Sequence, residues 1–97
     1  YDNMCIISKN NCIAELEACH IVPVATEEDY SLNNSLLLER NLHSTFDKYL
    51  WSINPNTFMI EVNNMCGSIK KYKGNIVKLN DNLKTNLYQH YNMFLKK

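Results

Sequence analysis

The residues best suited to chemistry are His20, Asn34, His43 and Asp47, which lie within one stretch of the chain. His43 and Asp47 fall four positions apart in a segment with helical periodicity, so their side chains should stand on successive turns of one helical face. An imidazole and a carboxylate arranged in this way can reach a single metal ion. Taken singly, the same pair is also typical of a surface hydrogen bond, and a lone histidine near a strand end is more often structural.

A β-hairpin and a helix are expected to position these side chains. Residues 21–22 have the character of the end of a buried strand, which stops at Pro23 because proline cannot donate to a β ladder. Residues 35–38 are predicted to form the returning strand, with residues 26–32 as a charged loop between the two. Residues 12–18 fit either a helical turn or a strand, and so short a run leaves both open.

Two helices are predicted from apolar spacing. The first covers residues 41–50 with Asn41 as its N-cap. Its apolar stripe consists of Leu42, Phe46, Tyr49 and Leu50. The second lies near the C-terminus, where Asp81 can act as the cap. Its core-facing stripe consists of Leu83, Leu87, Tyr91 and Phe94.

The remaining segments favour additional β structure. Residues 51–53 and 58–62 are predicted to form a second, small hairpin, because a Pro-Asn turn lies between them. Residues 4–8 and 75–79 are further strand candidates. The pattern predicts an α+β fold, with residues 1–97 forming a single domain.

Composition sets limits on the class of protein. The chain has 97 residues, of which 45% are hydrophobic, and this fits one small globular domain with a modest core. It has neither a signal-peptide pattern nor an apolar run near the roughly 18 residues of a membrane span. We therefore expect an intracellular protein, in the cytoplasm or nucleus, without a membrane partner. Because the chain begins with Tyr1 instead of Met, we expect a piece of a longer protein.

The net charge of zero conceals a gradient along the chain. Residues 1–50 hold three basic and eight acidic residues, whereas residues 51–97 hold seven lysines and two acidic residues. The densest basic cluster consists of Lys70, Lys71 and Lys73. Such a cluster can neutralise the phosphates of a nucleic acid. It is equally well explained as a solvated lysine-rich face.

The four cysteines, Cys5, Cys12, Cys19 and Cys66, lack the C-x-x-C spacing of common zinc sites. In a chain without a secretory signal, reduced and buried thiols are the default. We therefore expect core thiols, with a cysteine-containing structural zinc site as the alternative.

Taken together, three motifs resemble those of the HNH endonuclease family. They are Cys-His-Ile-Val-Pro at residues 19–23, Asn34 with three leucines behind it, and His-x-x-Phe-Asp at residues 43–47. The resemblance is to the branch with an A-H-I-x-P, N-G-x-x-L and H-x-x-F-D signature. It is firm over residues 17–47 and weaker onward to Phe94. Each motif alone is weak, whereas the ordered set is specific.

The resemblance implies a ββα-metal fold, in which a β-hairpin packs on a helix around one divalent cation. It assigns His20 as the general base that activates water, and Asn34 as the residue that orients the imidazole and pins the hairpin loop. It assigns His43 and Asp47 as metal ligands. The implied ion is Mg²⁺ or Mn²⁺, with Zn²⁺ or Ni²⁺ as alternatives, and the implied substrate is DNA, double-stranded by expectation. Further domains of a longer chain, or a homodimer, are implied partners.

Two positions depart from the family pattern. Many relatives carry Asp or His where this chain has Cys19, which is either inert or a thiolate ligand that favours softer metals. Ser35 replaces the glycine that follows the asparagine. Two other classes of function stay open: a catalytically silent ββα module that binds nucleic acid or protein, and a small zinc-stabilised structural domain.

Overall fold

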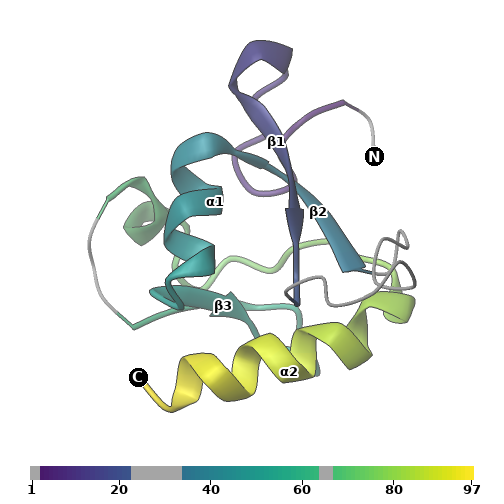
Figure 1. Ribbon diagram of the computed structural model, residues 1–97, viewed down its shortest axis with the longest axis vertical. Helices are drawn as coiled ribbons and strands as arrows, with labels where there is room; N and C mark the ends of the chain where they lie inside the picture. Colours follow the sequence, from purple (N-terminus) through teal and green to yellow (C-terminus); the bar gives the residue numbers. More distant parts are fainter. Residues whose placement is uncertain (1–2, 23–33, 64–66) are drawn as a thin grey trace.

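The chain forms the predicted β-hairpin followed by a helix, although its first strand ends at His20 and not at the predicted residues 21–22. In the computed structural model, which describes residues 3–22, 34–63 and 67–97, strands β1 (Leu16–His20) and β2 (Ser35–Glu39) pair antiparallel. Residues 12–18, for which the sequence left both a helical turn and a strand open, form a 3₁₀ turn at Ile13–Glu15 and then the first part of β1. The expected charged loop and Cys66 lie outside the described residues. Figure 1 shows the hairpin crossing beside α1 (Arg40–Asp47).

The boundaries of α1 differ from the predicted ones at both ends. Its N-cap is Glu39 instead of Asn41, because the chain passes from β2 into the helix without a connecting loop. The Asn41 side chain donates instead to the hydroxyl of Ser68. The helix ends at Asp47, short of the predicted Leu50, and Tyr49 has a φ of 58° in the left-handed region that commonly ends helices.

A second layer supports this hairpin–helix unit. Strands β3 (Trp51–Ile53) and β4 (Ile60–Val62) form the predicted small antiparallel hairpin, and α2 (Lys84–Leu95) packs against β3. Figure 1 shows α2 running along the base of the molecule below α1 and β1. A 3₁₀ turn, Asp81–Leu83, leads into α2, and its cap is Asn80, whose side chain accepts from the Asn82 N–H. The N-cap of α2 itself is Leu83, so the prediction of Asp81 was wrong.

One hydrophobic cluster joins the two layers. Leu42 and Phe46 of α1 are buried in it beside Trp51, whose Nε1 donates to the Leu42 carbonyl at 3.2 Å. On α2 the buried stripe is Leu87, His90 and Phe94, while Tyr91 is only half-buried. With Leu42 and Phe46 turned inward, the neighbouring face of α1, which carries His43 and Asp47, is left beside β1.

Two predicted strands are absent as such from the described residues. Residues 4–8 form turns, although Cys5, Ile6 and Ile7 are buried, and the Ile6 N–H donates to the Leu37 carbonyl at 3.0 Å. The segment after Gly74 makes a single β-bridge, between Met59 and Ile76. The first run is therefore buried without forming a ladder, whereas in the second run Val77 is buried and Ile76 is 70% exposed. Apolar character alone therefore did not identify a strand.

Candidate metal centre

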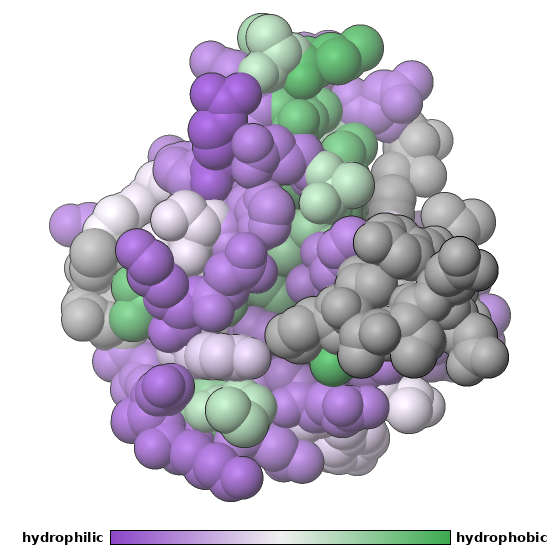
Figure 2. Space-filling view, in the orientation of Figure 1, coloured by the Kyte–Doolittle hydropathy of each residue, from purple (hydrophilic) through white to green (hydrophobic). Residues whose placement is uncertain are grey.

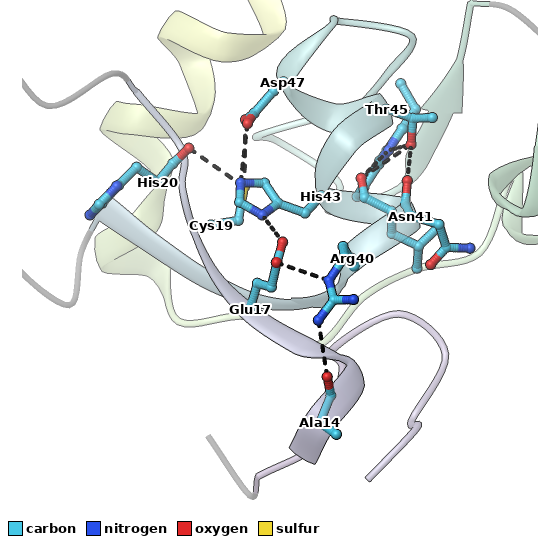
Figure 3. Close-up of polar contacts among 11 residues, drawn as sticks. Ala14, Glu17, Cys19, His20, Arg40, Asn41, His43, Thr45 and Asp47 are labelled. Carbon is cyan, nitrogen blue, oxygen red and sulfur yellow. Dashed lines mark hydrogen bonds and ion pairs between the residues drawn. The ribbon is translucent and has the colours of Figure 1, made fainter. Parts of the chain in front are cut away.

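Three side chains converge where α1 faces β1. Cys19 lies on β1, and His43 and Asp47 lie on successive turns of α1. One ligand atom from each residue can be chosen so that all three lie within 4.8 Å of one another. Nε2 of His43 is 3.1 Å from Oδ2 of Asp47, and Sγ of Cys19 is 3.9 Å from Oδ1 of the same carboxylate. Figure 3 shows these groups meeting at one point between the strand and the helix.

Glu17 determines which nitrogen of His43 faces this point. Its Oε1 lies 2.8 Å from Nδ1 of His43, and its Oε2 accepts from Nε of Arg40 at 3.1 Å. Because an ionised carboxylate only accepts, Nδ1 donates to Glu17, and this contact leaves Nε2 turned toward Cys19 and Asp47. The hydrogen bond from His43 lowers the pKa of Glu17, and Arg40 lowers it further, so the carboxylate stays ionised at neutral pH.

Cys19 is the buried member of the cluster. Burial raises the pKa of its thiol well above the ordinary value, and the negative charges of Asp47 and Glu17 raise it further. Its Sγ is fully buried and makes only long contacts, 3.6 Å to the His20 carbonyl and 3.9 Å to Asp47. Without a cation the group is therefore a thiol, whereas a bound divalent ion would favour the thiolate.

Glu17 is the residue at this site that sequence reasoning missed. Adjacent residues of a strand point to opposite faces, so Glu17 and Cys19 share the face that fronts α1, and His20 points the other way. This alternation was available in the sequence. It could be used only once residues 16–20 were known to form a strand, and the sequence left that segment undecided.

His20 and Asn34 lie at the open end of the hairpin. His20 is half-buried, and Figure 3 shows its imidazole pointing away from the convergence point. The buried Asn34 side chain accepts from the Val22 N–H at 2.9 Å and donates to the Val22 carbonyl at 3.0 Å. Asn34 thereby holds the chain just after His20, whereas its expected role toward the hairpin loop stays a prediction. Its role toward the imidazole stays a prediction.

The lysine cluster lies elsewhere on the molecule. Lys70 and Lys71 belong to a 3₁₀ turn, Ser68–Tyr72, on the side of α1 away from β1 (Figure 1). Lys73 follows that turn and is exposed, as the other two lysines are. The structure does not bring these residues to the convergence point, and their contact with nucleic acid stays a prediction.

The other cysteines form no metal site among the described residues. Cys5 is buried and Cys12 is exposed, so the expectation that Cys12 belongs to the core was wrong. Within the described ranges, the single group of three or more potential ligands is Cys19, His43 and Asp47. None of the helices in those ranges is long and apolar enough to cross a membrane.

His90 occupies the core between α1 and α2. Its Nε2–H donates to the Phe46 carbonyl at 2.8 Å, and its Nδ1 lies 2.7 Å from the Ser52 hydroxyl. Because a carbonyl only accepts, Nε2 carries the proton and Nδ1 accepts from Ser52. The ring stacks on Phe46 with centroids 3.6 Å apart. Burial lowers the pKa of His90 to about 4, so the ring is neutral at physiological pH.

The comparison with protein families agrees with this arrangement. The sequence model of the HNH endonuclease family matches residues 5–54, which include the hairpin, α1 and β3. A comparison with curated proteins gave no match. The match spans more than half of the chain, and the small α+β fold fits the ββα core of the family. The chain belongs to the HNH endonuclease family.

Family membership and the geometry together give a coarse functional assignment. The chain is of a nuclease type, and it has a group of side chains that could hold a metal ion. The donor set fits such an ion, since it combines an imidazole nitrogen, a carboxylate oxygen and a thiol that lacks a short hydrogen bond.

Proposed function

We propose that the protein is a metal-dependent endonuclease that hydrolyses DNA phosphodiester bonds. The observation that carries the proposal is the convergence of Cys19, His43 and Asp47 beside the strand end that bears His20, inside the segment matched by the family. We propose that the three convergent residues hold one divalent cation and that His20 acts as the general base.

The chain's own groups have distinct tasks in this proposal. When bound, the cation would polarise the scissile phosphate and stabilise the leaving oxygen. A neutral His20 imidazole accepts a proton from the attacking water, a task that suits a group whose ordinary pKa is near working pH. Asn34 keeps the strand end in place through its two hydrogen bonds to Val22. Glu17 holds His43 with Nε2 directed at the ion.

The donor set bears on the choice of ion. Oxygen ligands suit Mg²⁺ and Mn²⁺, whereas imidazole suits Zn²⁺ and Ni²⁺, and thiolate suits Zn²⁺. The sequence alone favoured Mg²⁺ or Mn²⁺, before Cys19 was placed beside Asp47. With the thiol in the cluster, we propose that Mg²⁺ is disfavoured and that Mn²⁺, Zn²⁺ and Ni²⁺ compete for the site.

Plasmid nicking tests the proposal. Supercoiled DNA is incubated with the protein and Mg²⁺, Mn²⁺, Ni²⁺ or Zn²⁺ in turn, with EDTA and a His20→Ala protein as controls. We expect metal-dependent conversion to open circles, which EDTA abolishes and which falls at least about 10²-fold in the variant. Nicked circles are the expected product, since one site cuts one strand and a double-strand break needs a second copy.

Other outcomes would count against the proposal in different ways. If the folded and metal-loaded protein cleaves no DNA, the catalytically silent binding module becomes the better account. If cleavage is equally fast in His20→Ala, the assignment of the base is wrong or the activity belongs to a contaminant.

A further inference from the structure

A groove opens beside the candidate metal centre. On one side it is lined by Ile21 and Val22, just after β1, and by Tyr49, just after α1. On the other side it is lined by an α2 face that includes Gln89 and Lys96. Its volume of about 410 Å³ lies within the range of ligand-binding clefts.

Some residues that line the groove directly follow the candidate site residues along the chain. Ile21 directly follows His20, and Tyr49 comes two residues after Asp47. Figure 1 shows β1 descending toward α2 and ending above it. A strand of nucleic acid with one phosphate at the metal centre therefore has this groove as an adjacent path.

The chemistry of the α2 face suits a phosphate backbone. Gln89, Asn92 and Lys96 are exposed and spaced three and four residues apart, so they share one side of the helix. Amide and ammonium groups of this kind donate hydrogen bonds to phosphate oxygens. Residues 82–97 contain no Asp or Glu, and no carboxylate lines the groove in the described part of the chain. In Figure 2 the surface over α2 is mainly hydrophilic.

Tyr49 adds an aromatic wall next to a positive charge. Nζ of Lys97 lies 5.7 Å from the centroid of the Tyr49 ring, so a second ammonium group is close to the groove. The ring is half-buried and forms part of the lining. Tyr49 therefore gives the groove an aromatic wall against which a sugar of the backbone can pack.

We propose that this groove binds the sugar–phosphate backbone of the DNA strand next to the scissile phosphate, with Gln89, Asn92 and Lys96 as phosphate contacts. The inference rests on the proposed nuclease function, because it assigns the substrate path of the same site. It places the substrate on the α2 side of the metal centre, away from the cluster of Lys70, Lys71 and Lys73.

Two matched pairs of variants test the groove. Lys96→Gln removes one positive charge from it, and Lys84→Gln makes the same change near the N-terminal end of α2, outside the lining. Asn92→Asp adds a negative charge to the groove, and the exposed Asn82→Asp makes the same change elsewhere. All four side chains are at least partly exposed, so the folded state should tolerate each change.

Binding is measured by fluorescence anisotropy of a labelled DNA duplex in a His20→Ala background, and cleavage is measured with His20 present. We expect Lys96→Gln and Asn92→Asp to weaken binding several-fold and to raise KM with kcat unchanged. Lys96→Gln should also reduce the slope of log K against log salt by about 0.9. Lys84→Gln and Asn82→Asp should bind like the parent protein.

The outcomes separate the groove from the nuclease. If the parent cleaves DNA and the groove variants match their controls in binding and KM, the groove does not bind the substrate, whereas the proposed nuclease function is supported. If the parent binds DNA through Lys96 and Asn92 without cleaving it, the binding role of the groove is supported and the proposed nuclease function is rejected. If the parent does not bind DNA at all, the inference is overturned.

Discussion

His43 belongs to α1 and His90 packs against that helix from α2, yet the two side chains occupy opposite environments. His43 is partly exposed at 24% of its side chain and has a carboxylate within 3.1 Å of each ring nitrogen, Glu17 on one side and Asp47 on the other. His90 is 4% exposed and is held between a backbone carbonyl, a serine hydroxyl and the ring of Phe46. Negative charge around an imidazole suits a cation, whereas neutral partners and burial suit a structural histidine.

The regions around these two histidines therefore differ in character: one is a candidate metal site and the other is part of the core. The face between β1 and α1 gathers Glu17, Cys19 and Asp47 around a partly open point. The layer between α1 and α2 is apolar, and His90 satisfies the Phe46 carbonyl there. Substitutions in the first region are expected to reduce cleavage of DNA, and substitutions in the second are expected to reduce the stability of the fold.

The largest effect should come from His43→Ala. Removal of the imidazole takes away one of three ligands, and a metal contribution of several kcal/mol corresponds to a loss of cleavage of at least about 10³-fold. The free energy of unfolding should change little, because the side chain is not part of the core. Ser44→Ala, on the exposed face of the same helix, is the matched control and should cleave normally. Cleavage by His43→Ala close to the parent rate would remove His43 from the site.

A smaller effect is expected for Glu17→Gln. The amide keeps the size of the side chain but removes the charge that holds Nδ1 of His43. Loss of the hydrogen-bond partner behind a metal-binding histidine typically weakens metal binding about 10- to 100-fold. The affinity for Mn²⁺ can be measured by calorimetry. Glu15→Gln, two residues earlier on an exposed side chain, should bind Mn²⁺ like the parent. Equal affinities for the two variants would show that Glu17 does not support the centre.

The buried environment of His90 also predicts that the stability of the protein depends on pH. The pKa of its ring is about 4 in the folded protein and near 6.5 when unfolded, so between these values the unfolded chain binds more protons. The free energy of unfolding should therefore fall as pH falls, by about 2 kcal/mol from this residue between pH 7 and pH 5. Urea unfolding at several pH values measures the total, and NMR titration of the ring identifies the residue. A His90 pKa near 6.5 would contradict the account.

The sequence predicted the order of elements around the site, because apolar spacing and turn residues act locally. The strand at residues 35–38, the hairpin after Trp51 and the spacing of His43 and Asp47 were all correctly predicted. These features depend on neighbours within a few residues. The helix boundaries were less accurate, because β2 runs directly into α1 and the left-handed Tyr49 ends it.

The features that the sequence did not predict depend on distant partners. Glu17 meets His43 only when the hairpin packs on α1, and their separation in sequence carries no periodic signal. Tyr91 was assigned to the buried stripe of α2, but the neighbouring His90 is buried because Phe46 and Ser52 satisfy both of its ring nitrogens. A buried polar side chain is recognised only once its partners are placed.

The most direct test of the central claim is a Co²⁺ titration followed by absorption spectroscopy. The account predicts one equivalent of Co²⁺ bound and a thiolate-to-cobalt band in the near ultraviolet. The band should be absent in Cys19→Ser and retained in Cys12→Ser, and binding should be greatly weakened in His43→Ala. If the folded parent shows no saturable binding, or if the band of the parent persists unchanged in both Cys19→Ser and His43→Ala, the convergence of Cys19, His43 and Asp47 is not a metal centre.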